Sequence, residues 1–386
     1  MLTTLAVENY RSLRDLVLPL SGLTVVTGPN GSGKSSLYRA LRLLADASRN
    51  GAVAALAREG GLPSTLWAGP ENGVRRGTTR VEGKVHTNAV GLRLGFAGDE
   101  FGYALDLGLP VPGKRTLFNL DPEFKREAVW SGPFLRPSAL LADRAGPSVR
   151  TRVESGGWGG DRFKIRLTDS MLSEFADPRA CPELVVLRER IRSWRFYDHF
   201  RADADAPARQ SRIGTRTPVL SHDGADLAAA LQTIIEVGRA ADLAEVLDAA
   251  FPGSTVEVRR SEDGLLSVEF RQHGLLRALS AAELSDGTLR FLLWVAALLT
   301  PRPPELLVLN EPETSLHPDL LPALATLIAT AAKETQLVVV SHAQPLIRAL
   351  AEVAEVSTVE LEKEYGETKV AGQGRLDRPA WHWPAR

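Results

Sequence analysis

The pattern of apolar and polar positions along the chain predicts an α/β protein built around buried strands. Apolar runs at 23–26, 306–309 and 337–340 are short and rich in leucine and valine, which is typical of strands buried in a parallel sheet. Apolar residues at helical spacing follow the first run over 35–47 and precede the second over 289–299. We therefore expect a mainly parallel sheet flanked by helices.

Two further patterns predict an antiparallel subdomain and a less regular insertion. From 74 to 109 apolar and polar residues alternate between glycine-containing turns, which predicts three or four antiparallel strands. Residues 110–217 carry scattered proline, glycine and arginine, so we expect loops to dominate there, with one helix over 182–200. The remaining predicted elements are strands at 2–7 and 16–20, a helical piece at 51–67, two helices over 225–250, and hairpins at 254–270 and around 365–367.

The helix predicted over 182–200 interleaves arginines at 188, 190, 192 and 195 with aromatic residues at 194, 196, 197 and 200. Basic and aromatic residues in such an arrangement bind a phosphate backbone or stack on bases in nucleic-acid-binding proteins. An amphipathic helix with a solvated basic face and a buried aromatic face produces the same pattern. We favour this second interpretation.

Residues 28–35 fit the phosphate-binding loop pattern Gly-x-x-x-x-Gly-Lys-Ser/Thr at every fixed position, and they lie between a predicted strand and a predicted helix. Glycines allow the backbone N–H groups and the helix N-terminus to face an anion. In this motif Lys34 reaches the β- and γ-phosphates, and the Ser35 hydroxyl ligates Mg²⁺. The predicted nucleotide-binding residues of the loop are Asn30, Gly31, Ser32, Gly33, Lys34, Ser35 and Ser36.

A second group of polar residues lies in the last third of the chain. Residues 284–287 (Leu-Ser-Asp-Gly) precede an apolar helix, where a serine hydroxyl and backbone N–H groups form an anion site. One buried strand ends in residues 310–313 (Asn-Glu-Pro-Glu), and the next ends in Ser341-His342. Acidic groups at the end of a buried parallel strand are where phosphate-loop enzymes hold a metal ion and polarise water.

These motifs, in this order, resemble the ATP-binding cassette ATPases, specifically the RecF-, SMC- and OLD-like branch that includes the AAA_21 ATPases. The resemblance rests on Tyr10-Arg11-Ser12-Leu13, Leu284-Ser285-Asp286-Gly287 and residues 310–318. It spans both ends of the chain, and it is specific for ATP chemistry rather than for a biological role. It implies an ATPase head with a parallel phosphate-loop sheet, an antiparallel β subdomain and a helical lobe. We divide the chain into residues 1–109 and 218–386, which form the head, and an insertion at 110–217.

The resemblance also implies roles for individual residues. Glu311 would be the general base that orients the attacking water, and His342 the switch histidine that contacts the γ-phosphate. Ser285-Asp286-Gly287 would contact the γ-phosphate of ATP held by a second copy of the chain. Arg11 resembles the N-terminal arginine that approaches the phosphates in this branch, and a plain surface arginine is the alternative.

The chain departs from the branch where an acidic residue usually stands, because it has Asn310 there. We expect Ser35 and Asn310 to be the residues at the metal site. Because the amide of Asn310 offers no charge to Mg²⁺, we also expect a slower turnover of ATP. The glutamine loop of the branch is not identified, since the neighbours of Gln210 give no support. Because Lys34 and the two candidate catalytic residues are retained, we still expect ATP hydrolysis.

Composition restricts the expected partners and compartment. The formal net charge of -1 gives no overall attraction to nucleic acid or to an anionic membrane. One cysteine, Cys181, excludes an intrachain disulfide framework and a cysteine-cluster zinc site, and it fits a reducing cytoplasm. The start of the chain has no leader pattern, and no apolar run reaches roughly 18 residues. We therefore expect a cytoplasmic protein without a membrane partner.

The two half-sites predict a homodimer in which two copies bury two ATP molecules head to tail and separate after hydrolysis. DNA is one expected partner, bound through residues 110–217 in repair or genome maintenance. A separate effector protein, regulated without DNA contact as in defence pairs, is the alternative. The motor of a membrane transporter fits the motifs less well. No acidic block after His342 resembles the nuclease domain of OLD enzymes, so we expect no nuclease activity in the chain.

Overall fold

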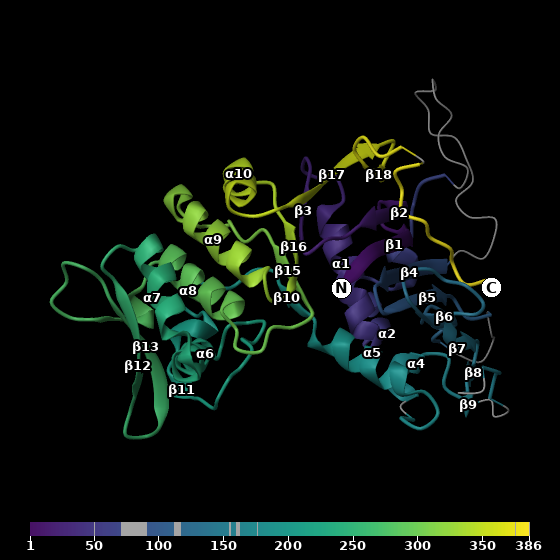
Figure 1. Ribbon diagram of the computed structural model, residues 1–386, viewed down its shortest axis with the longest axis horizontal. Coiled ribbons are helices and arrows are strands. Elements are labelled where there is room, and N and C mark those ends of the chain that lie inside the picture. The colour runs from purple at the N-terminus through teal and green to yellow at the C-terminus, as the bar shows by residue number, and fades with distance from the viewer. Residues whose placement is uncertain are drawn as a thin grey trace. The chain divides into compact units, whose positions relative to one another are not determined.

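The computed structural model describes residues 1–49, 51–70, 91–111, 117–153, 156–159, 163–175, 177–374 and 376–385 of the 386-residue chain (Figure 1). The chain forms two compact units. The first contains Met1–Ser21, Val26–Trp194 and Thr358–Arg386, and the second contains Gly22–Val25 and Arg195–Ser357. The part of the predicted antiparallel sheet at 74–90 lies outside the described residues. The division into 1–109, 110–217 and 218–386 stays a prediction.

The first unit is built on an antiparallel sheet. Within the described residues this sheet has eight strands in the order β2-β1-β4-β5-β6-β7-β8-β9. Every neighbouring pair is antiparallel. The strands are β1 (Leu2–Tyr10), β2 (Leu13–Pro19), β4 (Gly91–Gly98), β5 (Phe101–Gly108), β6 (Glu123–Ser131), β7 (Leu140–Ala145), β8 (Ser148–Thr151) and β9 (Phe163–Lys164).

Strands β6 to β9 continue this sheet into residues 110–217, where no strand was predicted, although loops still dominate among the described residues of that segment. Glu127 on β6 and Arg144 on β7 are fully buried, and their carboxylate and guanidinium lie 2.5 Å apart. Arg144 also donates to the carbonyl oxygens of Asp169 and, at 2.8 Å, Arg166. A buried charged pair interrupts the apolar alternation by which strands are recognised in a sequence. The hydrogen bonds of Glu127 and Arg144 hold β6 and β7 together, although the hydrophobic pattern of the sequence does not reveal these strands.

Helices and a C-terminal hairpin complete the first unit. Helix α1 contacts β1 and β4 and buries its apolar stripe there. The helical piece predicted at 51–67 is two short helices, because Gly60 and Gly61 separate them with φ angles of 96° and 84°. The elements are α1 (Lys34–Ala47), α2 (Ala52–Arg58), α3 (Leu62–Thr65), α4 (Met171–Glu174), α5 (Pro182–Ser193), β17 (Ser357–Glu364) and β18 (Glu367–Val370). The last two confirm the predicted hairpin around 365–367.

The tail after the hairpin packs on the antiparallel sheet. The ring of Trp381 lies edge-on to Trp130 of β6, with centroids 5.7 Å apart, and it also meets Trp383 at 5.2 Å. A side chain at Gly95 of β4 would overlap the Trp381 ring. Trp381 and Trp383 thus pack, partly buried, against the core of the first unit.

The second unit carries the parallel sheet that the apolar runs predict. Strands β10, β15 and β16 are parallel neighbours, and β3 follows β16 in the sheet. Helix α8 is buried on all sides from Leu289 to Leu298 and packs against α6 and α9, which lie beside it in Figure 1. The elements are β3 (Leu23–Thr27), β10 (Arg195–Tyr197), β15 (Leu306–Asn310), β16 (Gln336–Val340), α6 (Leu227–Ile234), α7 (Ala240–Ala250), α8 (Asp286–Leu298), α9 (Leu321–Ala331) and α10 (Gln344–Val353).

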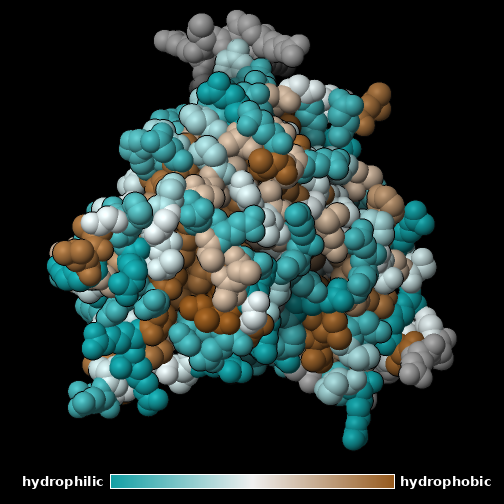
Figure 2. All heavy atoms as spheres, turned by 60° about the vertical axis from the view of Figure 1, so that its left-hand side comes forward, coloured by the Kyte–Doolittle hydropathy of each residue, from teal (hydrophilic) through white to brown (hydrophobic). Residues whose placement is uncertain are grey.

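A smaller sheet lies at the edge of the second unit. Its strands are β11 (Arg212–Ile213), β12 (Thr255–Arg260), β13 (Leu265–Arg271) and β14 (Leu279–Ser280). Strands β12 and β13 confirm the hairpin predicted at 254–270. A π turn at Ile235–Arg239 joins α6 and α7, where two helices were predicted over 225–250. The face turned forward in Figure 2 mixes small groups of hydrophobic side chains with hydrophilic ones.

The helix predicted over 182–200 ends at Ser193, and the residues after it form β10. Trp194, Tyr197 and Phe200 are at most 2% exposed. Arginines of α5 are engaged in ion pairs, such as Arg190 with Glu100 at 2.7 Å. Three of the four aromatic residues are therefore buried as expected, but they follow the helix, whose own buried residues are Leu184, Leu187 and Ile191, so the predicted helix with an aromatic face is wrong. Among the described residues no helix is long and apolar enough to cross a membrane.

Candidate functional site

The phosphate-binding loop connects β3 to α1. Gly28, Gly31 and Gly33 have φ angles of 142°, 78° and 109°, which glycine adopts without strain. Lys34 is 6% exposed, and its Nζ donates to the carbonyl oxygen of Gly28 at 2.6 Å. The buried Ser32 hydroxyl has no hydrogen-bond partner among the described residues. Successive backbone N–H groups, an ammonium and an unpaired hydroxyl form a cradle suited to an anion.

The other predicted loop residues lie at the surface of this cradle. Asn30, Gly31 and Ser35 are exposed, and Ser36 is half-buried. The exposed Ser35 hydroxyl at the start of α1 is available to a metal ion, as the motif requires.

The C-terminal hairpin of β17 and β18 packs against the phosphate-binding loop. Thr368 of β18 donates its hydroxyl to the carbonyl oxygen of Ser32 at 2.7 Å. A side chain at Gly33 would overlap the Thr368 hydroxyl, and one at Gly28 would overlap the carbonyl oxygen of Leu361 on β17. Both glycines are thus required by close backbone approach as well as by their φ angles. Sequence reasoning missed Thr368, because no motif marks it.

Arg11 lies in the tight turn between β1 and β2, with a φ angle of 51°. Its Nη2 donates to Oε2 of Glu59 at 2.7 Å, and the Tyr10 hydroxyl donates to the same oxygen at 2.8 Å. Burial and this carboxylate raise the pKa of Tyr10 well above its usual range. Glu59, the residue directly after α2, therefore holds Arg11, and contact of Arg11 with phosphates stays a prediction.

In the second unit, the candidate base and the candidate switch histidine lie together. Glu311 follows β15, where its N–H donates to the carbonyl oxygen of Val340 at 2.7 Å. His342 follows β16, and its Nδ1 lies 3.4 Å from Oε1 of Glu311. Both side chains are partly exposed, at 39% for Glu311 and 49% for His342. Because β15 and β16 are parallel, their carboxyl ends bring these two residues to one edge of the sheet.

Glu313 holds the two strand ends in place. Its carboxylate is 7% exposed, and Oε1 accepts hydrogen bonds from the Ser341 hydroxyl at 2.7 Å and from the backbone N–H groups of His342 and Ala343 at 3.2 Å. Its other oxygen, Oε2, has no partner among the described residues. Glu313 thus positions His342, a role that sequence reasoning did not assign although the residue lies within the quoted motif.

Asn310 has a partner that the sequence did not reveal. Its Nδ2 donates to Oδ1 of Asp198 at 2.6 Å, and Asp198 directly follows β10. The amide oxygen of Asn310 is buried and has no hydrogen-bond partner among the described residues. A carboxylate and an unpaired amide oxygen therefore lie side by side at the same edge of the sheet as Glu311.

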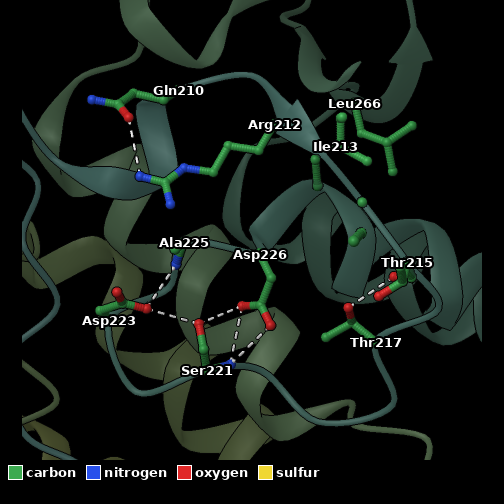
Figure 3. A pocket seen from close by; sticks show the side chains of 13 residues that line it. Gln210, Arg212, Ile213, Thr215, Thr217, Ser221, Asp223, Ala225, Asp226 and Leu266 are labelled. Atoms are coloured by element: carbon green, nitrogen blue, oxygen red, sulfur yellow. Dashed lines mark hydrogen bonds between the residues drawn. The ribbon is translucent and has the colours of Figure 1, made fainter. Parts of the chain in front are cut away.

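Gln210 lies elsewhere in the second unit. Its amide oxygen accepts a hydrogen bond from Arg212 at 3.0 Å, beside an open pocket of about 330 Å³ (Figure 3). Figure 3 shows Asp223, Ser221 and Asp226 linked by hydrogen bonds on the opposite wall of this pocket. None of the candidate catalytic residues lines it. The pocket therefore gives Gln210 no role in the nucleotide site.

The turn that contains residues 285–287 is braced by a distant arginine. Ser285 caps α8 by accepting the N–H of Thr288 at 3.2 Å. Arg209 donates to the carbonyl oxygens of Ala281 and Leu284 at 2.8 Å and to the carboxylate of Asp286 at 2.8 Å. The turn therefore enters α8 in a defined conformation, with the Ser285 hydroxyl and the first N–H groups of the helix at its end.

The family model described as "AAA domain, putative AbiEii toxin, Type IV TA system" matches residues 23–349, which include the phosphate-binding loop, the turn at 285–287 and the ends of β15 and β16. The chain belongs to the AAA_21 family. An OLD nuclease of Thermus scotoductus is 50% identical over 44 residues, which are 11% of this chain and 8% of that protein. This AAA_21 chain therefore matches a small part of that relative.

Solved structures show the fold of this AAA_21 protein. An SMC head solved in complex with the C-terminal winged-helix domain of ScpA aligns with a TM-score of 0.50 at 15% identity, over 96% of this chain and 97% of that chain. The SMC head domain of Thermotoga maritima aligns with a TM-score of 0.46 at 15% identity, over 96% and 98% of the two chains. The α/β ATPase-head fold that the sequence predicts is confirmed.

The residues of this AAA_21 protein fit ATP and Mg²⁺. The loop supplies an ammonium and anion-facing N–H groups, and the unpaired Asn310 oxygen and the exposed Ser35 hydroxyl are hard oxygen donors of the kind that Mg²⁺ prefers. Within the described ranges no cluster of three or more His, Cys, Asp or Glu side chains could hold a metal ion by itself.

Proposed function

We propose that this AAA_21 protein hydrolyses ATP and uses it as a dimerisation switch that acts on DNA. The observation that carries the proposal is the pairing of Glu311 with His342, 3.4 Å apart at the carboxyl edge of the parallel sheet, in a chain that also has a complete phosphate-binding loop. A base beside a histidine at this edge is the arrangement needed to orient water against a terminal phosphate.

In the proposed reaction, the loop N–H groups and Lys34 bind the β- and γ-phosphates. Glu311 accepts a hydrogen bond from the attacking water and takes its proton, while the water oxygen forms a bond to the γ-phosphorus and the bond to the β–γ bridging oxygen breaks. His342 donates to a γ-phosphate oxygen. Bound Mg²⁺, with Ser35 and Asn310 as ligands, would neutralise charge on the phosphates.

The turn at 285–287 gives the proposed switch its second half-site. A capped helix start offers N–H groups and a hydroxyl to an anion, so it suits the γ-phosphate of ATP bound by another copy of the chain. ATP would then join two copies in a homodimer, and loss of the γ-phosphate would release them.

We also propose that the protein works in the cytoplasm.

We propose that the switch acts on DNA, in repair or genome maintenance, because the motifs resemble the DNA-maintenance branch. A second candidate is regulation of a separate effector protein. The family description, with its putative toxin and Type IV TA system, favours this alternative.

Hydrolysis by the purified protein with Mg²⁺, with and without duplex DNA, tests the proposal, and Lys34→Ala is the control that loses phosphate binding. We expect ATP turnover that Lys34→Ala abolishes and that DNA raises. Binding to DNA should weaken steeply as salt rises, because phosphate contacts release counterions. If DNA leaves the rate of ATP hydrolysis unchanged, the result would favour regulation of a separate effector protein. Failure of the wild-type protein to bind ATP would contradict the proposal altogether.

A further inference from the structure

The end of β10 lies beside the end of β15. The two strands are parallel with Tyr197 opposite Leu309, so the next residues, Asp198 and Asn310, are neighbours at the carboxyl edge of the sheet. Their side chains meet, with Nδ2 of Asn310 donating to Oδ1 of Asp198 at 2.6 Å. Asp198 is exposed, so its carboxylate keeps free access to solvent.

This hydrogen bond determines which way the amide of Asn310 presents its oxygen. Because Nδ2 is committed to Asp198, Oδ1 is the amide atom that remains for a ligand. That oxygen is buried and has no partner among the described residues, which is costly unless a ligand satisfies it. A neutral oxygen donor and a carboxylate are thus presented side by side, next to the candidate base Glu311.

One buried arginine fixes the two segments relative to each other. Arg290 of α8 donates to the carbonyl oxygen of Phe200, at 3.2 Å, and to that of Thr314, at 2.8 Å. Phe200 lies two residues after Asp198, and Thr314 lies three residues after Glu311. Arg290 therefore ties the segment that carries the carboxylate to the turn that carries the base.

We propose that Asp198 supplies the carboxylate of the Mg²⁺ site and that Asn310 supplies an amide oxygen. The negative charge that is missing at position 310 would then be provided from the neighbouring strand. Phosphate-loop Mg²⁺ sites use one or two carboxylates with substrate phosphates, so one carboxylate at either position satisfies the charge requirement. The inference rests on the proposed function, because it concerns the metal ion that accompanies ATP.

Exchange of the two side chains tests the inference. Binding of a fluorescent ATP analogue is titrated with Mg²⁺ in the wild type, in Asp198→Asn and in the double variant Asp198→Asn/Asn310→Asp. Electron paramagnetic resonance of Mn²⁺ then measures metal binding directly. Asp198→Asn should weaken metal affinity in the ATP complex by about 10- to 100-fold, the usual cost of losing a residue that supports a metal site. The double variant should regain most of this affinity, because it restores one carboxylate.

Asp203→Asn is the matched control, because Asp203 is an exposed aspartate paired with Arg201 outside the strand ends. It should bind metal and nucleotide like the wild type. Unchanged metal affinity in Asp198→Asn, or no recovery in the double variant, would overturn the assignment of Asp198 while leaving ATP binding intact. If the wild-type protein binds no ATP, either in the absence or in the presence of metal, the proposed function itself is contradicted. Thermal unfolding of each variant checks that the fold is retained.

Discussion

The backbone conformation of one residue, Glu311, sets the local geometry of the turn after β15. Glu311 has a φ angle of 49°, in the left-handed region that non-glycine residues rarely adopt. Such strain costs on the order of 1–3 kcal/mol and persists where the surrounding structure compensates. In this protein the N–H of Glu311 donates to the carbonyl oxygen of Val340, and its carboxylate lies 3.4 Å from Nδ1 of His342.

Gly28 gives a prediction at the scale of one residue. Gly28→Ala places a Cβ against the carbonyl oxygen of Leu361 at a φ angle of 142°, so the loop or β17 must shift. We expect the free energy of unfolding to fall by on the order of 3 kcal/mol, with loss of ATP binding. Urea unfolding and ATP titration measure both effects.

Gly31→Ala is the matched control for that substitution. Its φ angle of 78° is also left-handed, but its Cβ would meet open space. It should therefore cost only about 1 kcal/mol. Equal effects of the two substitutions would show that backbone strain, rather than contact with β17, decides the requirement for glycine.

At the scale of elements, the start of α8 depends on a partner far away in sequence. Arg209 contacts residues 72 to 77 positions further along the chain and is 7% exposed. Glu283 adds a local brace: hydrogen bonds from Arg277 and then from Ser280 lower the pKa of its carboxyl to about 2. The turn is thus held from both sides, which a functional contact at Ser285 requires.

Removal of the Arg209 side chain tests this brace. In Arg209→Ala three carbonyl oxygens, those of Ala281, Ala282 and Leu284, and the carboxylate of Asp286 lose a charged donor, so the turn should open more often. We expect amide hydrogen exchange over residues 284–289 to rise roughly 30-fold, which corresponds to about 2 kcal/mol. Arg212→Ala is the control, because Arg212 is exposed and donates to the side chain of Gln210 at 3.0 Å. Unchanged exchange in Arg209→Ala would mean that Ser280 and Glu283 suffice to hold the turn.

At the scale of the whole molecule, the proposed switch predicts a change in oligomeric state. Glu311→Gln keeps the shape of the side chain but removes the base, so ATP should bind without being cleaved. We expect this variant to form ATP-dependent dimers more strongly than the wild type, as measured by sedimentation with saturating ATP and Mg²⁺. The same substitution combined with Lys34→Ala should stay monomeric, because it cannot hold the nucleotide. A monomeric Glu311→Gln protein under these conditions would rule out the dimer switch.

The sequence alone determined the parts of this protein whose signal is contiguous. The phosphate-binding loop, the turn before α8, the motif after β15 and both hairpins are each encoded within a dozen or so residues, so spacing and periodicity reveal them. The same local reasoning failed over 110–217, where a buried ion pair breaks strand alternation, and at 182–200, where a helix changes to a strand after Ser193.

Only the tertiary structure decided which distant residues complete each site. Asp198 reaches Asn310 across 112 positions because two parallel strands end side by side, and Thr368 reaches Ser32 across 336 positions through the C-terminal hairpin. Such pairs depend on strand register and packing between elements, which leave no periodic trace in either segment. The sequence therefore shows that an acidic residue is absent at position 310, whereas the fold shows that the carboxylate of Asp198 lies beside Asn310.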